Sequence, residues 1–321
     1  MKLFQEYLDS VNMAIATIPY PQHPGQLYEP IAYHMALGGK RVRPVLTLMA
    51  CDAMGGDSAM ATDAAVGLEM FHNFTLLHDD VMDNADVRRG KPAVHRRWDD
   101  NTAILSGDTM LTIATQYIAR IANWQVMNLF NKTAIEIYEG QQWDMDYENR
   151  NDVTVEEYIN MIRLKTSVLL GCALKTGALI ADADDMEADL LYQAGVNMGL
   201  AFQLRDDVLD VWGDPETFGK EIGGDIMNNK KTFLLINAFQ LADGQQLAEL
   251  NRWTQLASFN EQEKIAAVTA IYNTLNIKQL TVEKINHYFT EAQRTLSGIN
   301  LPAEGKQSLQ EFAQSLINRS Y

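Results

Sequence analysis

The sequence predicts an all-α protein, a single domain over residues 1–321 with roughly ten helices. Apolar residues recur at three- and four-residue intervals along most of the chain, which is the spacing of one helix face. No stretch alternates convincingly between apolar and polar residues as a half-buried strand does, and no Asn-Gly pair marks a hairpin. No low-complexity linker divides the chain, so one helical domain is expected.

The predicted helices can be followed in order. Near the start, Gly38 and Gly39 suit the end of one helix, and Pro44 suits the first turn of the next. Helical spacing then runs through 61–78, 102–122, 128–147, 155–178, 186–211, 231–242, 262–274 and 281–296. The chain has only eight prolines, and none of them falls within these stretches.

The composition narrows the function classes. Apolar residues make up 47% of the chain, enough for a real core and too many for a disordered protein. The formal net charge of -16 disfavours a protein that binds nucleic acid through its overall field. A local basic pocket for phosphates remains compatible with this charge.

Several features predict a cytoplasmic protein. Cys51 and Cys172 stand alone in apolar helical stretches, so we interpret them as reduced core residues. Glu6 and Asp9 interrupt the N-terminal stretch where a signal peptide needs an apolar run. No uncharged apolar stretch reaches the ~20 residues of a membrane span.

One acidic pattern occurs twice, and basic residues follow it each time. Residues 79–83 read DDVMD and residues 206–210 read DDVLD. The carboxylates are those of Asp79, Asp80, Asp83, Asp206, Asp207 and Asp210. The basic residues that follow them are Arg88, Arg89 and Lys91 in the first case, and Lys220, Lys230 and Lys231 in the second.

Helical geometry places carboxylates of one motif close together. Each residue turns a helix by about 100°, so Asp79 and Asp83 lie ~40° apart and His72 points in nearly their direction. Such close carboxylates repel each other unless a divalent cation sits between them. Magnesium prefers oxygen ligands and often binds carboxylates together with substrate phosphates. If the two acidic helices face each other, a diphosphate can be clamped between them, with the basic residues neutralising the remaining charge.

A simpler interpretation stays open for each motif alone. An acidic cluster at a helix end is often solvated surface or a helix cap. Two copies, each followed by basic residues, favour the metal and diphosphate interpretation. An EF-hand is excluded because its alternating oxygen ligands and central glycine are missing.

These motifs resemble those of the trans-isoprenyl diphosphate synthases, the polyprenyl synthetase family. The resemblance covers nearly the whole chain in order: GGKRVRP (38–44), DDVMD (79–83), Arg88-Arg89, LKT (164–166), FQLRDDVLD (202–210), GK (219–220) and GGDIMNNKK (223–231). It implies a helical bundle around a central cavity, assembled as a homodimer. It also implies condensation of isopentenyl diphosphate with an allylic diphosphate, using three Mg²⁺ per active site, which Mn²⁺ can replace.

The resemblance also implies a role for individual residues. Asp79, Asp83 and Asp206 would be the main magnesium ligands, supported by Asp80, Asp207 and Asp210. The allylic diphosphate would bind Arg88, Lys165, Lys220 and Lys230. Isopentenyl diphosphate would bind Lys40, Arg43, His72 and Arg89. The developing allylic cation would face dipoles of Lys165, Thr166 and Gln203.

The basic residues also have ordinary interpretations. Without the other motifs, Lys40 and Arg43 would be a solvated helix terminus, and His72 would be a hydrogen-bonded core histidine. The register of His72 with the first acidic motif favours the functional role. We interpret Arg41 and Lys231 as surface residues, because nothing in the sequence separates them from solvation.

Product length is predicted from the residues that precede the first acidic motif. Phe74 lies ~7.5 Å and Phe71 ~12 Å before Asp79 along the helix axis, so their rings could floor a tunnel, with the smaller Thr75 nearer the acids. In the family an aromatic residue at the position of Phe74 accompanies short products, C15 or C20, and the second ring, Phe71, makes us favour C15 over C20. The two-residue spacing before Asp83 also occurs in geranylgeranyl and longer-chain synthases. Alternatively, both rings simply pack against a neighbouring helix.

Other functions remain possible. A terpene cyclase would have a mixed second motif and no isopentenyl site, unlike this chain. A non-catalytic subunit of a heteromeric synthase would carry a broken aspartate motif. A phosphohydrolase would need a positioned water and no long apolar cavity. The terpene cyclase is the nearest enzymatic rival, and a longer-chain polyprenyl diphosphate synthase or the non-catalytic subunit stays open as the alternative.

Overall fold

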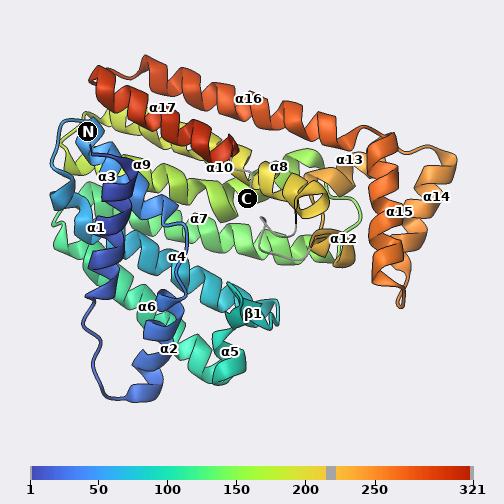
Figure 1. The fold of residues 1–321 in the computed structure, drawn as a ribbon, viewed down its shortest axis with the longest axis horizontal. Helices are drawn as coiled ribbons and strands as arrows, with labels where there is room; N and C mark the ends of the chain where they lie inside the picture. Colours follow the sequence, from blue (N-terminus) through green and yellow to red (C-terminus); the bar gives the residue numbers. More distant parts are fainter. Residues whose placement is uncertain (1, 215–221, 319–321) are drawn as a thin grey trace. The chain divides into compact units, whose positions relative to one another are not determined.

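The computed structural model describes residues 2–214 and 222–318, and it confirms the all-α fold (Figure 1). The chain divides into two compact units, each built from separate stretches of sequence. Unit 1 comprises Met1–Lys132, Cys172–Tyr192 and Ile299–Leu309; unit 2 comprises Thr133–Gly171, Gln193–Gly298 and Gln310–Tyr321. A single domain over 1–321 stays a prediction. None of the helices in the described ranges combines the length and apolar character needed to cross a membrane.

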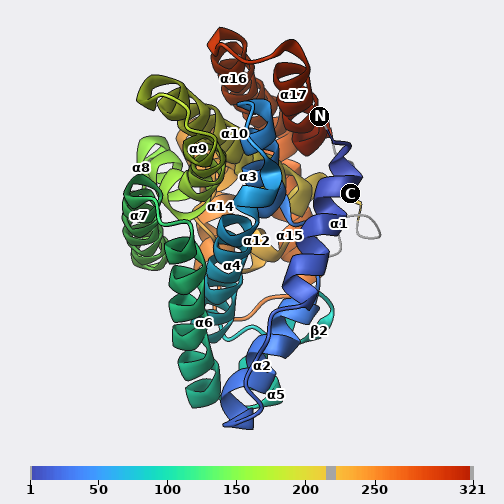
Figure 2. The same cartoon turned by 90° about the vertical axis from the view of Figure 1, so that its left-hand side faces the viewer.

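Unit 1 is organised around α4, which ends in the first acidic motif. Its elements are α1 (Phe4–Ala16), α2 (Gly25–Ala36), α3 (Val42–Ala53), the 3-10 helix η1 (Ser58–Ala61), α4 (Thr62–Met82), β1 (Val87–Arg88), β2 (Lys91–Pro92), α5 (Val94–Arg97) and α6 (Asp100–Arg120). The helices α2, α4 and α6 run alongside one another (Figure 2). A side chain at Gly67 would meet the Ala114 carbonyl oxygen at 3.1 Å, so glycine lets α4 and α6 approach closely.

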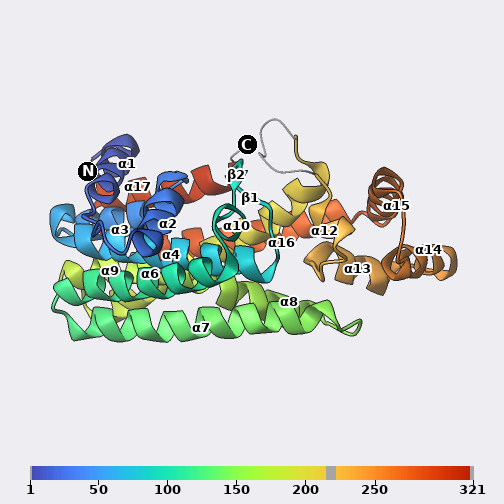
Figure 3. The same ribbon diagram turned by 90° about the horizontal axis from the view of Figure 1, so that it is seen from below.

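Unit 2 contains the second acidic motif and most of the C-terminal helices. Its elements are α8 (Val155–Ile162), the π-helix η2 (Arg163–Ser167), α12 (Gly224–Met227), α13 (Phe233–Leu241), α14 (Gly244–Gln255), α15 (Glu261–Thr274) and α16 (Ile277–Gly298). The helices α13, α14 and α15 gather together (Figure 3). Four helices contribute residues to both units: α7 (Trp124–Glu148), α9 (Val168–Ile180), α10 (Asp185–Trp212) and α17 (Ala303–Asn318).

Local sequence signals explain several helix starts. Thr154 caps α8 by accepting a hydrogen bond from the Glu157 backbone N–H at 3.1 Å, while the Glu157 carboxylate accepts one from the Thr154 N–H at 2.8 Å. Asp99 caps α6 by accepting a hydrogen bond from the Thr102 N–H at 2.8 Å. These bonds satisfy N–H groups that the first turn of a helix leaves without helical partners.

The structure differs from the sequence prediction in three places. The predicted helix 155–178 is divided into α8, η2 and α9. The helices α1, α5, α12, α14 and α17 were not predicted; α14, for example, buries only Leu250 and Trp253, too few apolar residues for a clear pattern. Finally, β1 and β2 form a short antiparallel pair where no strand was expected.

Candidate functional site

The last turn of α4 presents two predicted magnesium ligands. Asp79 and Asp83 are one turn apart, and the Asp83 backbone N–H donates to the Asp79 carbonyl oxygen at 2.8 Å. The Asp79 side chain is 20% exposed and Asp83 is exposed. Carboxylates near a helix C-terminus are unfavourable unless cations compensate them. Two accessible carboxylates on one turn match the hard oxygen donors that magnesium prefers.

Asp80, the third carboxylate of this motif, points into the interior. It is buried, and the Arg88 Nε donates to its Oδ1 at 2.9 Å. Arg88 also lies 3.9 Å from the Asp79 carboxylate. Burial raises the pKa of Asp80, while the bound Arg88 opposes that shift. Arg88 therefore lies among the carboxylates, and its predicted contact with a diphosphate stays a prediction.

The two arginines after the motif belong to a tight hairpin. In this hairpin Arg88 of β1 pairs with Lys91 of β2. The turn residues Arg89 and Gly90 have positive φ angles of 53° and 72°, as a type I′ turn requires. The turn aims Arg89 at the GGKRVRP loop, where its Nη1 donates to the Gly38 carbonyl oxygen.

Glycine is required where Arg89 meets that loop. Gly38 and Gly39 have φ angles of 81° and 136°, values that favour glycine. A Cβ on Gly39 would also lie 2.9 Å from a guanidinium nitrogen of Arg89. The glycine pair thus makes room for the arginine. Lys40, the next predicted ligand, follows on the same loop and is exposed.

Arg43 and His72 meet although they are far apart in sequence. Arg43 Nη1 lies 3.2 Å from His72 Nε2. Burial lowers the pKa of Arg43 to about 10, and burial followed by the charge of Arg43 lowers the pKa of His72 well below its usual value. His72 is consequently neutral at pH 7. Unit 1 thus brings predicted isopentenyl diphosphate ligands together at one basic site.

Arg41 is buried, so its interpretation as a surface residue was wrong. Its Nη1 forms an ion pair of 2.6 Å with Glu69, and its Nη2 donates to the Met35 carbonyl oxygen at 3.0 Å. Asn73 donates to Glu69 Oε1 at 3.1 Å and accepts from Arg89 Nη1 at 3.3 Å. The sequence contained one sign of a buried ion pair, because Glu69 is a single acid inside an apolar run.

The second acidic motif in unit 2 is held by several protein groups. Asp206 is half-buried, whereas Asp207 is buried. Asp207 accepts a hydrogen bond from the Tyr158 hydroxyl. Its Oδ1 accepts another from the Gln203 Nε2 at 3.3 Å. Burial, followed by the charge of Asp225, raises the pKa of Asp207 well above its usual value. These partners agree with a supporting role for Asp207.

Asp210, the last acid of the second motif, organises the chain that follows it. The Asp210 Oδ2 accepts a hydrogen bond from the Asp225 backbone N–H at 3.1 Å. Its backbone carbonyl accepts another from the Gly223 N–H at 2.6 Å. The end of α10 thereby holds α12 and places Asp225, which sequence reasoning missed, beside the acidic motif.

The LKT segment lies in the π-helix η2. A Cβ on Gly140 of α7 would lie 2.3 Å from the Lys165 backbone nitrogen, and one on Gly199 of α10 would lie 2.6 Å from the Ser167 Cα. Two glycines therefore let helices press on both sides of η2. Short π-helical turns are frequent at functional sites. Lys165 Nζ donates to Asp144 at 2.6 Å, and the Thr166 hydroxyl donates to Gln203 at 3.3 Å.

A hollow of about 180 Å³ in unit 2 collects the predicted groups. Lys230 lies beside it, 3.9 Å from Asp144 and 3.5 Å from Glu148. Lys231 is half-buried and also lines it, so its interpretation as a surface residue was wrong. The full lining is Asp144, Tyr158, Met161, Ile162, Lys165, Thr166, Gln203, Asp207, Asp225, Lys230, Lys231 and Thr232. The predicted Lys220 lies outside the described residues.

The residues predicted to limit product length form a buried aromatic cluster in unit 1. The Phe71 and Phe74 ring centroids are 5.6 Å apart, and Phe71 also lies 5.2 Å from Phe130 at the start of α7. Thr75 is half-buried and donates to the carbonyl oxygen of His72 at 2.8 Å. Phe130 is therefore a specific partner for the alternative in which both rings simply pack against a neighbouring helix. That the rings form a floor that limits product length stays a prediction.

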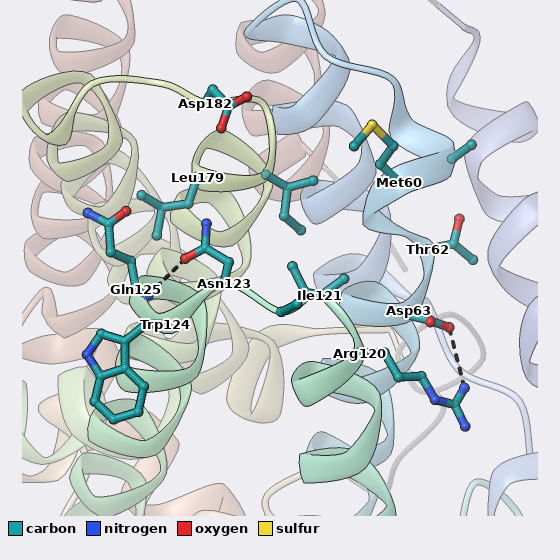
Figure 4. A pocket seen from close by; sticks show the side chains of 13 residues that line it. Met60, Thr62, Asp63, Arg120, Ile121, Asn123, Trp124, Gln125, Leu179 and Asp182 are labelled. Atoms are coloured by element: carbon teal, nitrogen blue, oxygen red, sulfur yellow. Dashed lines mark hydrogen bonds and ion pairs between the residues drawn. The ribbon is translucent and has the colours of Figure 1, made fainter.

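Another hollow in unit 1 lies at the opposite end of α4 (Figure 4). It has a volume of about 900 Å³, and its walls include Met60, Ile121 and Leu179. Asp63 and Arg120 form an ion pair of 3.7 Å beside it. Asp63 is sixteen residues before Asp79, or ~24 Å along a helix, so this hollow is separate from the acidic motif.

A helical fold with two acidic motifs, each beside basic side chains, is the arrangement that the resemblance to the trans-isoprenyl diphosphate synthases implies. Residues 24–273 match the model of the polyprenyl synthetase family, and the chain belongs to this family.

Individual relatives resemble the chain over most or all of its length. It is 38% identical over 317 residues to a geranylgeranyl diphosphate synthase of Methanosarcina mazei, covering 97% of this chain and 95% of that protein. It is 37% identical over 254 residues to a geranylfarnesyl diphosphate synthase of Natronomonas pharaonis, covering 73% and 74%. A crystal structure of geranylgeranyl pyrophosphate synthase has 43% identity and a TM-score of 0.93 and covers 100% of both chains.

Proposed function

We propose that this chain condenses isopentenyl diphosphate with an allylic diphosphate to make a trans-prenyl diphosphate, with geranylgeranyl diphosphate (C20) as its product. The observation that carries the proposal is the basic site of unit 1. There, Arg43 Nη1 lies 3.2 Å from His72 Nε2, and Arg89 donates to the Gly38 carbonyl oxygen in the glycine loop that precedes Arg43. Membership of the polyprenyl synthetase family supports the same reaction.

The C20 product replaces the C15 product that the sequence favoured. The relatives named above are C20 and C25 synthases, and neither supports a preference for C15. The spacing of the first motif, with two residues between Asp80 and Asp83, agrees with C20 and longer synthases. The phenylalanines before Asp79 remain a proposed floor, now for a longer tail.

The residues have distinct proposed tasks. Arg43, Arg89 and Lys40 hold the diphosphate of isopentenyl diphosphate, and neutral His72 adds a hydrogen bond without further charge. Lys165 and Lys230 bind the allylic diphosphate and stabilise the negative charge that grows on it as it leaves. Thr166 and Gln203, which are bonded to each other, turn dipoles toward the allylic cation.

Asp79, Asp83 and Asp206 would hold Mg²⁺, supported by Asp80, Asp207 and Asp210. When bound, the metal neutralises diphosphate oxygens and makes diphosphate a better leaving group. In the reaction, the allylic C–O bond breaks, and the isopentenyl double bond attacks the allylic cation to form the new C–C bond. A proton then leaves the adjacent carbon, passes to the released diphosphate and restores a double bond. Protein residues position the two substrates throughout.

A product assay tests this function. Protein, Mg²⁺ and labelled isopentenyl diphosphate would be incubated separately with dimethylallyl, geranyl and farnesyl diphosphates. We expect a C20 product from each primer. Asp79→Ala and Asp206→Ala should abolish turnover while helical content is kept. Asp63→Ala, at the other end of α4, is the matched control and should stay active. Folded wild-type protein that condenses none of the primers would contradict the proposal and favour a non-catalytic subunit.

We also propose a homodimer, as the family resemblance implies. Helix α7 exposes several large apolar side chains within unit 2: Ile135, Tyr138, Trp143 and Met145. Exposed apolar patches of this kind often mark protein interfaces. Light scattering coupled to size-exclusion chromatography should give twice the monomer mass, and a monomer mass would contradict this part of the proposal.

A further inference from the structure

Lys264 of α15 is an unusually placed cation within unit 2. Its side chain is completely buried, although burying a charged group is costly unless it has strong partners. Its Nζ donates to the Met227 carbonyl oxygen at 3.0 Å and to the Asn229 Oδ1 at 2.8 Å. It also lies 4.2 Å from the centre of the Phe259 ring. These contacts account for a buried lysine and attach α15 to residues 227–229.

The next residue of α15 holds the other end of the same segment. Gly223 has a φ of 86°, and a Cβ there would lie 2.7 Å from the Ile265 side chain. At the opposite end, Asn229 has a φ of 50°, a conformation that non-glycine residues seldom adopt. Ile265 therefore packs against Gly223, where the segment 223–229 begins, and Lys264 bonds to Asn229, where it ends. Gly223 and Asn229 are the two corners of this segment.

The segment 223–229 determines the positions of two residues that line the 180 Å³ hollow, Asp225 and Lys230. Asp225 lies within it and is bonded through its N–H to Asp210. Lys230 follows the Asn229 corner directly and lies 3.5 Å from Glu148. A shift of the corner would therefore move the Lys230 ammonium group. Lys264 itself does not line the hollow; it acts on this site through the segment 223–229, which it bonds at Met227 and Asn229.

We propose that Lys264 is a positioning residue: by bonding Asn229 and the Met227 carbonyl it sets Lys230 for the diphosphate of the allylic substrate. This inference rests on the proposed function. It assigns Lys264 a selective effect, because the isopentenyl site in unit 1 uses none of these residues. Loss of the Lys264 ammonium should weaken use of the allylic substrate and leave use of isopentenyl diphosphate unchanged.

Steady-state kinetics on the full-length protein test the selective effect. Lys264→Met keeps most of the side-chain volume and removes the ammonium group. We expect the KM for farnesyl diphosphate to rise about tenfold, which corresponds to ~1.4 kcal/mol, with the KM for isopentenyl diphosphate unchanged. Val268→Ala, one turn further along α15 and also buried, is the matched control. It should lower stability while leaving both KM values unchanged.

A second variant tests the route through the corner and does not depend on Lys264→Met folding. Asn229→Gly keeps the positive φ but removes the side-chain oxygen of Asn229, one of the two acceptors of Lys264. It should raise the same KM, and combining it with Lys264→Met should give less than the product of the two effects. Amide hydrogen exchange should also quicken at residues 228–230 in both variants but not in Val268→Ala.

The outcomes separate this inference from the proposed function. An active wild-type protein whose allylic KM is unchanged by Lys264→Met and Asn229→Gly overturns the positioning role alone. Equal increases in both KM values would also overturn it, since they indicate a general loss of structure. A folded wild-type protein without prenyl transfer would refute the proposed function, and the allylic assignment with it.

Discussion

Arg41 and Glu69 form an ion pair in the interior of unit 1, with 2.6 Å between Nη1 and Oε1 and side-chain exposures of 4% and 2%. The pair joins the start of α3 to the middle of α4. Arg41 has a φ of 50°, so the chain enters α3 through a conformation that costs energy. The ion pair holds this conformation between the glycines that receive Arg89 and the helix that carries His72.

Breaking this pair should cost much more stability than replacing it. Arg41→Met leaves the Glu69 carboxylate buried without its cation, and we expect a loss of ~3–5 kcal/mol. The double variant Arg41→Met/Glu69→Met removes both charges and should recover most of that loss. Urea denaturation of wild type, both single variants and the double variant measures the effect. Additive losses would show that the charges do not depend on each other.

The fold was largely predictable because helical spacing extends over long stretches. The ranges 102–122 and 186–211 correspond closely to α6 and α10, and 61–78 to α4, which runs on to Met82. The π-helix η2 was not predictable, because Leu164 continues the apolar spacing of the helices on either side and no breaker interrupts it. What distinguishes it is the close approach of Gly140 and Gly199, a tertiary relationship.

The candidate site was predicted in part. The motifs identified acids and bases that the structure brings together, such as Arg43 with His72 and Lys165 with Thr166 and Gln203. The partners that hold these groups were missed, because the buried Tyr158 and the half-buried Asp144 look ordinary in their own sequence context. Glu69, a single acid inside an apolar run, indicated a buried partner, but no local pattern identifies that partner as Arg41, since the two residues meet only in the fold.

Gly140→Ala should impair the site as well as the fold. Its Cβ would lie 2.3 Å from the Lys165 backbone nitrogen, so η2 must move. Gly177→Ala is the matched control, because its Cβ would lie 2.2 Å from the Thr47 carbonyl oxygen in unit 1. Both should lose ~1–3 kcal/mol. Only Gly140→Ala should also raise the allylic KM, and equal kinetics in the two variants would show that η2 tolerates the shift.

His34 should make the protein less stable in mild acid. It is fully buried, and burial, followed by the charges of Arg89 and Arg88, lowers its pKa to about 3. The unfolded chain, with a histidine pKa near ~6.5, takes up this proton first as the pH falls. Stability from this group is therefore complete above ~6.5 and declines by ~1.4 kcal/mol per pH unit below it. Urea unfolding of His34→Gln should show a correspondingly shallower decline between about pH 6 and about pH 4. Equal slopes would contradict the assignment.

Phe71 allows the floor and the packing interpretations to be separated. It is completely buried between Phe74 and Phe130, ~12 Å before Asp79 along α4. Phe71→Ala should cost ~3–5 kcal/mol under either interpretation, so stability cannot distinguish them. Product length can: a floor residue should yield products at least one C5 unit longer, detected by mass spectrometry after dephosphorylation. Met70→Ala is the matched control, since Met70 is equally buried but points ~100° away. Destabilisation in both variants with an unchanged product would contradict the floor and favour simple packing against α7.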